Sequence, residues 1–263
     1  MKSDKERLMP LFHSDTLMYA EHVARYAFAG KFVKNKKVLD CSCGSGYGTR
    51  MLANFGIHSA IGVDIDSEII KYAKTHYLTK NILFQTGDAT HLPFPKSSFQ
   101  VYICFETLEH VEEQEKLVAE AKRVLQKDGL YIISTPNKEM NKIKNPYHTK
   151  ELSFIEFERL LRGHFSYIVT LQQSNWISST ILPGDIKINQ NFTISAKTVT
   201  AHAKQKGLYF ITLASNKPIP EISVFQSTLF SPLRMNWLIE EVWQNTRFNY
   251  KKLGKAVKRF IGL

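Results

Sequence analysis

Three glycines alternate with other residues directly behind an apolar run that ends in an acid. The stretch VLDCSCGSGYGT, residues 38–49, carries Asp40 and then Gly44, Gly46 and Gly48. A glycine-rich turn between a strand and a helix brings backbone amides close to a nucleotide-type ligand. The dinucleotide fingerprint places its third glycine one residue later than it stands here. An acid this close to the turn repels a pyrophosphate and attracts an ammonium group, so we expect a cationic ligand.

Two more acids end the next apolar runs along the chain. Asp64 closes SAIGVDID, and Asp88 follows NILFQT. One carboxylate can accept both hydroxyls of a ribose, and the other can accept from an exocyclic adenine amine. Each acid alone is also typical of a surface turn. Because the carboxyl ends of neighbouring parallel strands border one crevice, three acids at successive strand ends predict a nucleoside site.

Two carboxylates and an imidazole follow the fourth apolar run. The stretch FETLEHV holds Glu106, Glu109 and His110, which share one face if the segment is helical. Such a set suits Mg²⁺, Mn²⁺ or Fe²⁺, with His148 of NPYH as a fourth ligand. A hydroxyl acceptor also needs a base or a metal, so Glu106, His110 and His148 are the catalytic candidates. The alternative is that this segment only packs and caps the next helix.

Alternating strand and helix signals over the first 135 residues predict a parallel sheet with crossover helices. Together with two later strands, they predict a doubly wound, mostly parallel sheet of seven strands, preceded by a helix and followed by a C-terminal extension. Strands are expected at 37–41, 59–66, 81–88, 99–106, 129–137, 166–173 and 207–215. Helices are expected at 14–30, 47–56, 68–77, 112–125 and 153–165.

Several residues carry helix-boundary signals. Ser14 or Asp15 is expected to start the first helix and Gly30 to end it. Ser67 is expected to cap the helix 68–77, and Ser153 with its partner three residues later forms a capping-box pattern.

The composition favours a protein of the cytoplasm. Of the 263 residues, 43% are hydrophobic, and no apolar run is long enough to cross a bilayer. The N-terminus is charged and lacks the apolar core of a signal peptide. Three cysteines, with Cys41 and Cys43 at a buried strand end, make neither a disulfide framework nor a zinc site and are expected to pack. The net charge of +11 indicates anionic partners, unless it is only a solvated surface.

Residues 174–206 are polar and weakly periodic, which is typical of a functional or disordered loop, and we expect them to cover an acceptor site. The ligand-binding domain is placed at 1–215 and a separate tail at 216–263. The tail has no acid after residue 243 and could form a basic amphipathic helix on an anionic membrane surface, at the inner face of the membrane. A solvated tail, or a helix packed on the domain, is the alternative. Nucleic acid is less favoured because aromatic residues are sparse there. The basic residues of the tail are Arg247, Lys251, Lys252, Lys255, Lys258 and Arg259.

The chain resembles the class I S-adenosylmethionine-dependent methyltransferases over about residues 15–172. The matching stretches are VLDCSCGSGYGT, IGVDID, FQTGDATHLPF, FETLEHV and LQKDGLYIISTPN, in that family's order. The resemblance implies a seven-stranded sheet with an antiparallel last hairpin and S-adenosylmethionine as methyl donor. It further implies the following cofactor contacts: Asp40 and Gly44 to Gly48 at the methionine part, Asp64 at the ribose, Asp88 with Ala89 at the adenine, Arg25 and Tyr19 over the methionine carboxylate, and Cys41, Ile65 and Phe105 beside them.

A narrower resemblance concerns the acceptor. HVARYAFAG, FETLEHV, NPYHTKELSFIEFERLL and GLYFITLAS are similar to methyltransferases of bacterial surface-glycan and O-antigen synthesis, although Ser45 stands where those have glutamate. This implies methyl transfer to a hydroxyl or amine of a sugar, carried on a nucleotide or a lipid, with Tyr147 and His148 lining the acceptor pocket. The E-x-x-E-H pattern also resembles metal-dependent O-methyltransferases of ubiquinone precursors and of RNA 2′-hydroxyls. An RNA 2′-O-methyltransferase and a non-catalytic binding module therefore remain alternatives.

Overall fold

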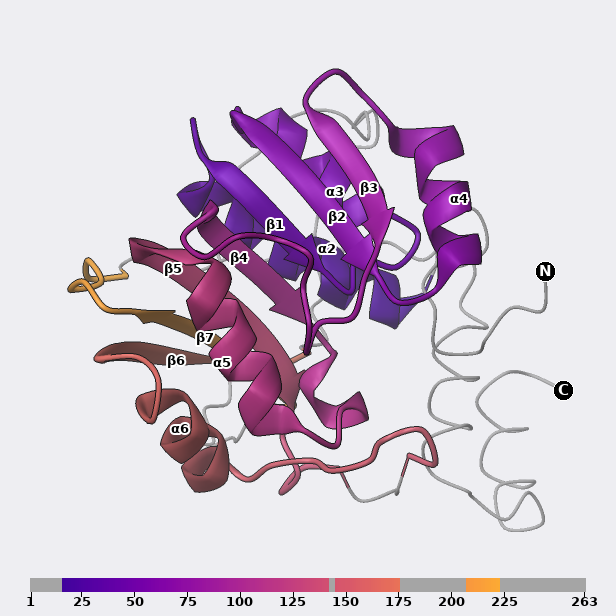
Figure 1. The fold of residues 1–263 in the computed structure, drawn as a ribbon. Coiled ribbons are helices and arrows are strands. Elements are labelled where there is room, and N and C mark those ends of the chain that lie inside the picture. The colour runs from indigo at the N-terminus through magenta and orange to yellow at the C-terminus, as the bar shows by residue number, and fades with distance from the viewer. Residues whose placement is uncertain (1–15, 142–144, 176–206, 223–263) are drawn as a thin grey trace, which may run out of the picture.

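The computed structural model describes residues 16–141, 145–175 and 207–222 (Figure 1). Its seven strands form one sheet in the order β3-β2-β1-β4-β5-β7-β6. β1 to β5 run parallel, whereas β7 is antiparallel to both β5 and β6. The predicted mostly parallel seven-stranded sheet is confirmed. The strands are β1 (Lys37–Cys41), β2 (Ser59–Asp64), β3 (Ile82–Thr86), β4 (Phe99–Phe105), β5 (Leu125–Pro136), β6 (Tyr167–Gln173) and β7 (Tyr209–Ser215).

Helices cover both faces of the sheet. One hydrophobic cluster packs apolar residues of α5 and α6 against the sheet, and the other packs α2, α3 and α4 against its opposite face. In Figure 1, α5 and α6 lie in front of the strands and α2 and α3 behind them. The helices are α2 (Leu17–Ala29), α3 (Tyr47–Leu52), α4 (Ser67–Tyr77), α5 (Gln114–Val124) and α6 (Phe154–Arg162), with short 3-10 turns η1 (Gly30–Phe32), η2 (Ala53–Phe55) and η3 (Leu108–His110).

The order in which strands are added to the sheet reverses between β1 and β4. β2 and β3 follow β1 outward on one side, and β4 then returns to the other side of β1. The loops after β1 and β4 therefore diverge and leave a crevice at the carboxyl ends of these strands, where open α/β sheets bind their ligands. These ends point to the lower right in Figure 1.

Two of the predicted helix caps are wrong. α4 is capped by Asp66, not Ser67, because the Asp66 carboxylate accepts from the backbone N–H groups of Glu68 and Ile69. α2 is capped by Thr16, whose hydroxyl accepts from the Tyr19 N–H, rather than by either of the two residues before it.

The capping box at the start of α6 is confirmed. The Ser153 hydroxyl accepts from the Glu156 N–H, and the Glu156 carboxylate accepts from the Ser153 N–H. Gly30 follows the last residue of α2, as predicted.

The segment after β4 is not α-helical. Glu106 has a left-handed backbone (φ 49°), and Leu108–His110 then form a single 3-10 turn. The predicted common helical face for Glu106, Glu109 and His110 therefore does not form. Most of the predicted cover at 174–206 and of the tail at 216–263 lies outside the described residues, so both remain predictions. Within the described ranges, no helix is long and apolar enough to span a bilayer.

Candidate functional site

The glycine turn after β1 is open at one glycine and packed at the other two. A Cβ built on Gly44 (φ 54°) would meet no atom within 4 Å. On Gly46 (φ 85°) it would lie 2.8 Å from Ala73, and on Gly48 it would lie 2.0 Å from the Tyr26 ring. Gly46 and Gly48 therefore let α3 and its turn pack against α4 and α2, whereas Gly44 leaves backbone exposed to an incoming ligand.

Asp64 fixes this open glycine to the end of β2. Its Oδ2 accepts from the Gly44 N–H at 2.9 Å, and its Oδ1 accepts from the Asp66 N–H at 3.0 Å. The next residue, Ile65, has 70% of its surface exposed although it is apolar. The structure thus brings a carboxylate, an exposed apolar side chain and an open glycine together after β1 and β2.

Asp40 lies beneath the turn. Both of its carboxylate oxygens accept from the Tyr26 hydroxyl, and Oδ2 also accepts from Thr49. Burial raises the pKa of Asp40 to about 7, although the hydrogen bonds from Thr49 and Tyr26 oppose this shift. Asp40 therefore holds α2 and α3 against the turn from inside the protein. Its neighbour Cys41 is buried in the core, where the predicted packing role fits.

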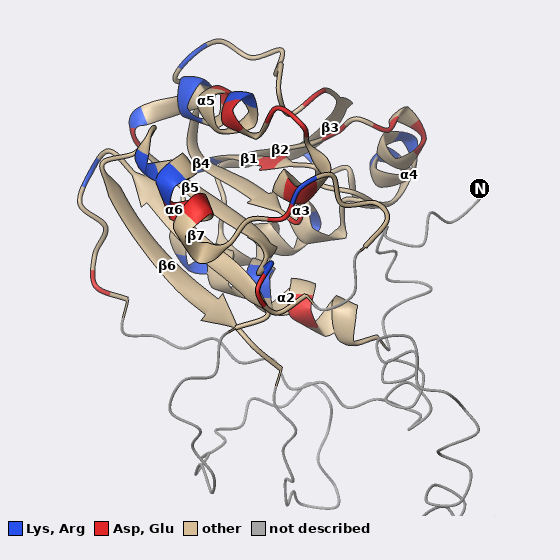
Figure 2. Ribbon diagram, turned by 90° about the horizontal axis from the view of Figure 1, so that it is seen from below, with Lys and Arg blue, Asp and Glu red and all other residues tan. Residues whose placement is uncertain are grey.

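Asp88 lies in the exposed turn after β3. Its Oδ1 accepts from the backbone N–H and the hydroxyl of Thr90, and the backbone bond is the main reason that its pKa is lowered. The Gly87 N–H donates to the Asp64 carbonyl, which joins this turn to the end of β2. Ala89 packs on the core. The acids at this end of the sheet are coloured red in Figure 2, which is seen from below.

Arg25 is a buried guanidinium and not a surface charge. Its Nε donates to Gln173 at 2.7 Å, and its guanidinium lies 4.2 Å from the centre of the Tyr209 ring. Nη1 lies 3.6 Å from Glu106 Oε1. Neither Nη1 nor Nη2 has a hydrogen-bond partner among the residues that the structure describes. The group therefore presents two unsatisfied donors beside the end of β4.

Glu21 accompanies Arg25 on the same side of α2. Its carboxylate accepts from Asn175 and from the Tyr209 hydroxyl. Burial raises the pKa of Glu21, and Arg25 opposes the shift. Together, Glu21 and Arg25 attach α2 to the β6–β7 hairpin. Phe105, the last residue of β4, packs edge-on against Tyr26, and Tyr19 lies beside Tyr47.

Two carboxylates at the end of β4 contact consecutive residues of β5. Glu106 accepts from the Ser134 hydroxyl at 2.6 Å, and Glu109 Oε2 accepts from the Thr135 hydroxyl at 3.0 Å. Burial, and then the charge of Glu106, raise the pKa of Glu109 well above its usual range. Glu109 Oε1 has no hydrogen-bond partner within the described ranges. The Glu109 carboxyl is therefore suited either to stay protonated or to bind a cation.

Three of the four predicted metal ligands come together. Ligand atoms of Glu109, His110 and His148 all lie within 4.8 Å of one another. The fourth, Glu106, lies outside this group because its left-handed backbone turns its carboxylate toward Ser134 and Arg25. The two imidazole rings meet edge-on with their centres 4.9 Å apart.

Both histidines have defined partners. His110 Nδ1 donates to the Tyr147 carbonyl at 3.0 Å, which leaves the lone pair of the neutral ring on Nε2, 3.9 Å from Glu109. His148 contacts Glu151 through Nδ1 and Asn145 through Nε2. Tyr147 itself is 51% exposed beside them. Of the residues predicted to handle an acceptor, His110, His148 and Tyr147 are therefore gathered at one place, whereas Glu106 faces Ser134 and Arg25.

Several residues that support this site were not predicted from the sequence. Glu21 could have been found, because it lies four residues before Arg25 on a helix. Ser134 and Thr135 are polar residues that directly follow the apolar run at 130–133, which is also a readable signal. Gln173 and Tyr209 carry no such signal, because their contacts with Arg25 depend on the folded hairpin.

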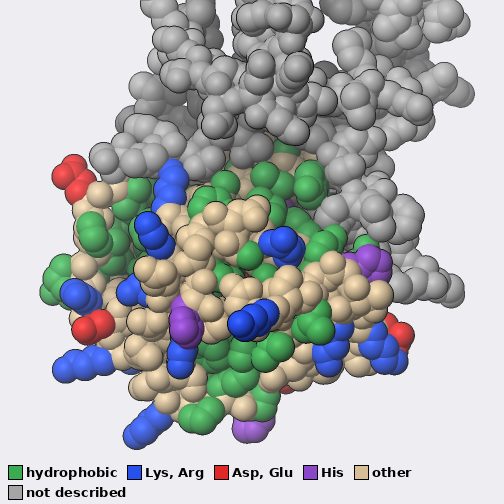
Figure 3. Space-filling model, turned by 90° about the horizontal axis from the view of Figure 1, so that it is seen from above, with side chains coloured by type: hydrophobic (Ala, Val, Ile, Leu, Met, Phe, Trp, Pro, Cys, Tyr) green, Lys and Arg blue, Asp and Glu red, His purple; other side chains and the backbone are tan. Residues whose placement is uncertain are grey.

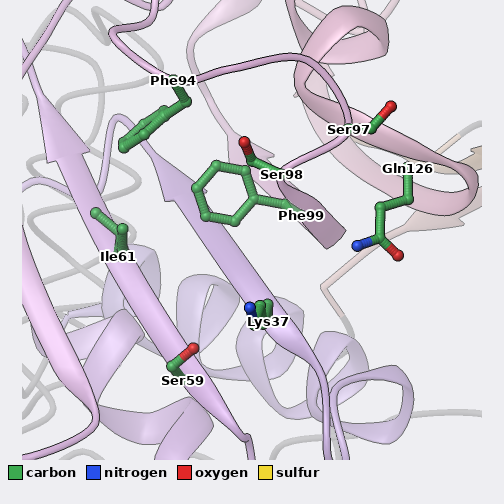
Figure 4. A pocket seen from close by; sticks show the side chains of 8 residues that line it. All are labelled: Lys37, Ser59, Ile61, Phe94, Ser97, Ser98, Phe99 and Gln126. Carbon is green, nitrogen blue, oxygen red and sulfur yellow. The ribbon is translucent and has the colours of Figure 1, made fainter.

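A separate pocket lies at the amino ends of the strands and shares no residue with this site (Figure 4). It is lined by Lys37, Ser59, Ile61, Phe94, Ser97, Ser98, Phe99 and Gln126. It contains no acid, histidine or cysteine, so the chemistry described above belongs to the opposite edge of the sheet.

The sequence is similar to those of known proteins. Residues 39–133 match the family model of a methyltransferase domain. A probable S-adenosylmethionine-dependent methyltransferase of Mycolicibacterium smegmatis is 30% identical over 161 residues, 59% of this chain and 62% of that protein. A ubiquinone biosynthesis O-methyltransferase of Coxiella burnetii is 33% identical over 110 residues, 40% of this chain and 46% of that protein.

A solved structure shows the same fold. The PH0226 protein of Pyrococcus horikoshii aligns with a TM-score of 0.57 at 20% identity, over 80% of this chain and 97% of that one. This chain spans less than two thirds of the length of the first curated relatives. The matched domain model and these relatives show that the chain is similar to S-adenosylmethionine-dependent methyltransferases over this region, and its seven-stranded sheet has the fold of the solved structure.

Proposed function

We propose that this chain transfers the methyl group of S-adenosylmethionine to a hydroxyl of a sugar in surface-glycan synthesis. The main support for the methyl-donor site is the contact between Asp64 and the open turn at Gly44. In this proposal the Asp64 carboxylate accepts from the ribose hydroxyls and Ile65 packs on the adenine. Asp88, ionised in its turn, accepts from the adenine amine.

The methionine end of the donor is assigned to the space between the glycine turn and Arg25. A guanidinium with two unsatisfied donors fits a carboxylate, which it can bind with two parallel hydrogen bonds. The cationic sulfonium and ammonium groups would favour the ionised form of Asp40 beneath the turn, whose pKa without the donor is about 7. Because Asp40 contacts Tyr26 and Thr49, it also sets the position of the turn itself.

The acceptor half is assigned to the end of β4. Methyl transfer is an in-line displacement in which the acceptor oxygen forms a bond to the methyl carbon while the sulfur–carbon bond breaks. A sugar hydroxyl must lose its proton in this step, and His110 and His148 are the candidate bases. Glu106, the other catalytic candidate, instead accepts from Ser134 and lies beside Arg25. Tyr147 supplies an exposed aromatic face next to His110 and His148, which suits the apolar face of a sugar ring.

A metal ion is the second means of activating a hydroxyl. Glu109, His110 and His148 form a donor set that fits Mg²⁺ or Mn²⁺, and such an ion would lower the pKa of a bound hydroxyl. His148 Nδ1 faces Glu151 and Nε2 faces Asn145 in this structure, so one of these partners would have to move aside for a metal ion.

The metal proposal has a direct test. If an ion bound by Glu109, His110 and His148 activates the acceptor, EDTA abolishes methyl transfer and added Mg²⁺ or Mn²⁺ restores it. Undiminished transfer in EDTA would exclude the metal and leave a histidine as the base.

An RNA 2′-O-methyltransferase is the second candidate function. The clustering of Glu109, His110 and His148 favours it, as does the excess of basic residues in the sequence. A non-catalytic binding module is a third, but the intact acids and glycines of the donor site count against it.

The experiment that separates these functions is label transfer from methyl-labelled S-adenosylmethionine into a fractionated host extract. Sugar nucleotides, lipid-linked glycans and small RNA are counted separately. Label in either glycan fraction supports the proposal, and label confined to RNA supports the second candidate. An absence of transfer into every fraction, with S-adenosylmethionine bound, would support the binding module.

A further inference from the structure

The segment that carries His148 is attached to the loop after β4. The backbone N–H groups of Thr149 and Lys150 donate to the Glu109 carbonyl at 2.8 and 3.1 Å. The Gln114 side-chain amide donates to the carbonyls of Leu108 and Lys150, at 2.9 and 2.8 Å. His148 is therefore positioned by the backbone next to His110 and not by side-chain packing alone.

The carboxylate of Glu151 contacts His148 at the Nδ1 side of the ring. Glu151 Oε1 lies 2.5 Å from His148 Nδ1 and also accepts from the Asn141 amide at 2.8 Å. The two side chains are only 11% and 14% exposed, so water competes little for this contact. A second amide, from Asn145, lies 3.0 Å from His148 Nε2.

These contacts define the tautomer of His148. An ionised carboxylate only accepts hydrogen bonds, so the proton of the neutral ring resides on Nδ1 and the lone pair on Nε2. The Asn145 amide can donate to that lone pair, which agrees with this assignment. The arrangement is that of a base oriented by a carboxylate through its other nitrogen.

We propose that Glu151 is a positioning residue that holds His148 as the base for the acceptor hydroxyl. The inference rests on the proposed function. The acceptor hydroxyl takes the place of the Asn145 amide at Nε2 and gives its proton to that nitrogen. Its oxygen bonds to the methyl carbon, and the electron pair of the broken sulfur–carbon bond stays on sulfur. Glu151 stabilises the imidazolium that forms.

This inference selects a hydroxyl over an amine as the acceptor. A neutral amine can attack first and lose its proton to water afterwards, so it gains little from an oriented base. A hydroxyl gains more, because its oxygen becomes a competent nucleophile as the proton leaves.

The test compares Glu151→Gln and His148→Gln with wild type. Glu113→Gln is the matched control, because Glu113 is exposed and pairs only with Lys116 among the described residues. In the fraction that takes up label, Glu151→Gln is expected to lower kcat about 10- to 100-fold. Its affinity for S-adenosylmethionine and its melting temperature stay unchanged. Unchanged kcat in Glu151→Gln, or complete loss of wild-type transfer in EDTA, would overturn the proposal.

Proton NMR in water provides a readout that does not depend on activity. An imidazole Nδ1 proton bound by a carboxylate resonates far downfield of the amide protons. It is expected in wild type and in Glu113→Gln, absent from His148→Gln, and lost or moved upfield in Glu151→Gln. If wild type transfers no methyl group to any fraction, the proposed function fails, while this spectrum still tests the Glu151–His148 contact. A wild-type spectrum without that resonance would contradict it.

Discussion

At the scale of single residues, the most unusual group is the buried carboxyl of Asp40. Burial raises its pKa from 3.8 to about 7. The unfolded chain ionises this group at its ordinary pKa, whereas the folded protein keeps it protonated to near neutrality. Its contribution to folding is therefore fully present in acid and is lost as the pH rises through about 7.

Asp40→Asn is expected to remove this loss, because the amide cannot ionise and keeps an oxygen that accepts from Tyr26 and Thr49. The free energy of unfolding of wild type, relative to the variant, should fall by a few kcal/mol between about pH 4 and pH 7. Urea titrations across that range measure it. Wild-type and variant curves that run parallel would show that Asp40 ionises normally in the folded protein.

The signals that lead to the proposed donor site are local in the sequence. A glycine turn and three acids at strand ends can be read without knowing which segments meet. The buried contacts of Arg25 with Gln173 and Tyr209 were not predictable, because they join residues 148 or more positions apart. Arg25 was predicted at the donor carboxylate, and two of its nitrogens have no hydrogen-bond partner within the described residues.

At the scale of elements, the strands were predictable and the loop after β4 was not. Apolar runs separated by turn residues mark each strand, and the last two strands pair as an antiparallel hairpin as the family resemblance implied. The left-handed backbone at Glu106 broke the predicted helical face. A non-glycine residue seldom adopts this conformation, so the local sequence does not predict it.

Gly48 joins two of these elements. Its added methyl group in Gly48→Ala would collide with the ring of Tyr26, whose hydroxyl donates to Asp40. We expect a loss of about 1–3 kcal/mol in stability, because neither ring nor helix can move without disturbing the turn. Thermal unfolding measures it.

Gly163→Ala is the matched control for that prediction. Gly163 has a right-handed helical backbone, and the nearest atom to a Cβ there is a carbonyl oxygen at 3.3 Å. Equal melting temperatures for the two variants would mean that the α2–α3 contact is less tight than the structure shows.

At the scale of the whole molecule, charge is distributed unevenly along the sequence. Acidic and basic residues nearly balance in the described ranges, so most of the net charge of +11 comes from the other segments, the C-terminal tail above all. The side of the molecule seen in Figure 3 carries scattered Lys and Arg side chains and few acids. An anionic partner is therefore expected to bind mainly through the tail.

A chain ending at residue 242 tests that expectation. The full chain should sediment with anionic liposomes and the shortened chain should not, because each basic residue near such a surface contributes about 1 kcal/mol. Neutral liposomes are the control. If the full chain stays in the supernatant with anionic liposomes, the proposed membrane contact is wrong.

The measurement that tests the central claim most directly is calorimetric titration of S-adenosylmethionine into wild type, Asp64→Ala and the exposed control Glu68→Ala. A carboxylate that accepts from ribose contributes charge-assisted hydrogen bonds, so Asp64→Ala should weaken binding by about tenfold or more. Glu68→Ala should bind like wild type, because Glu68 pairs with Lys71 on the surface of α4. Saturable binding by wild type that depends on Asp64 is the predicted result. Equal affinity in all three proteins, or no binding by wild type, would contradict the assignment of the donor site.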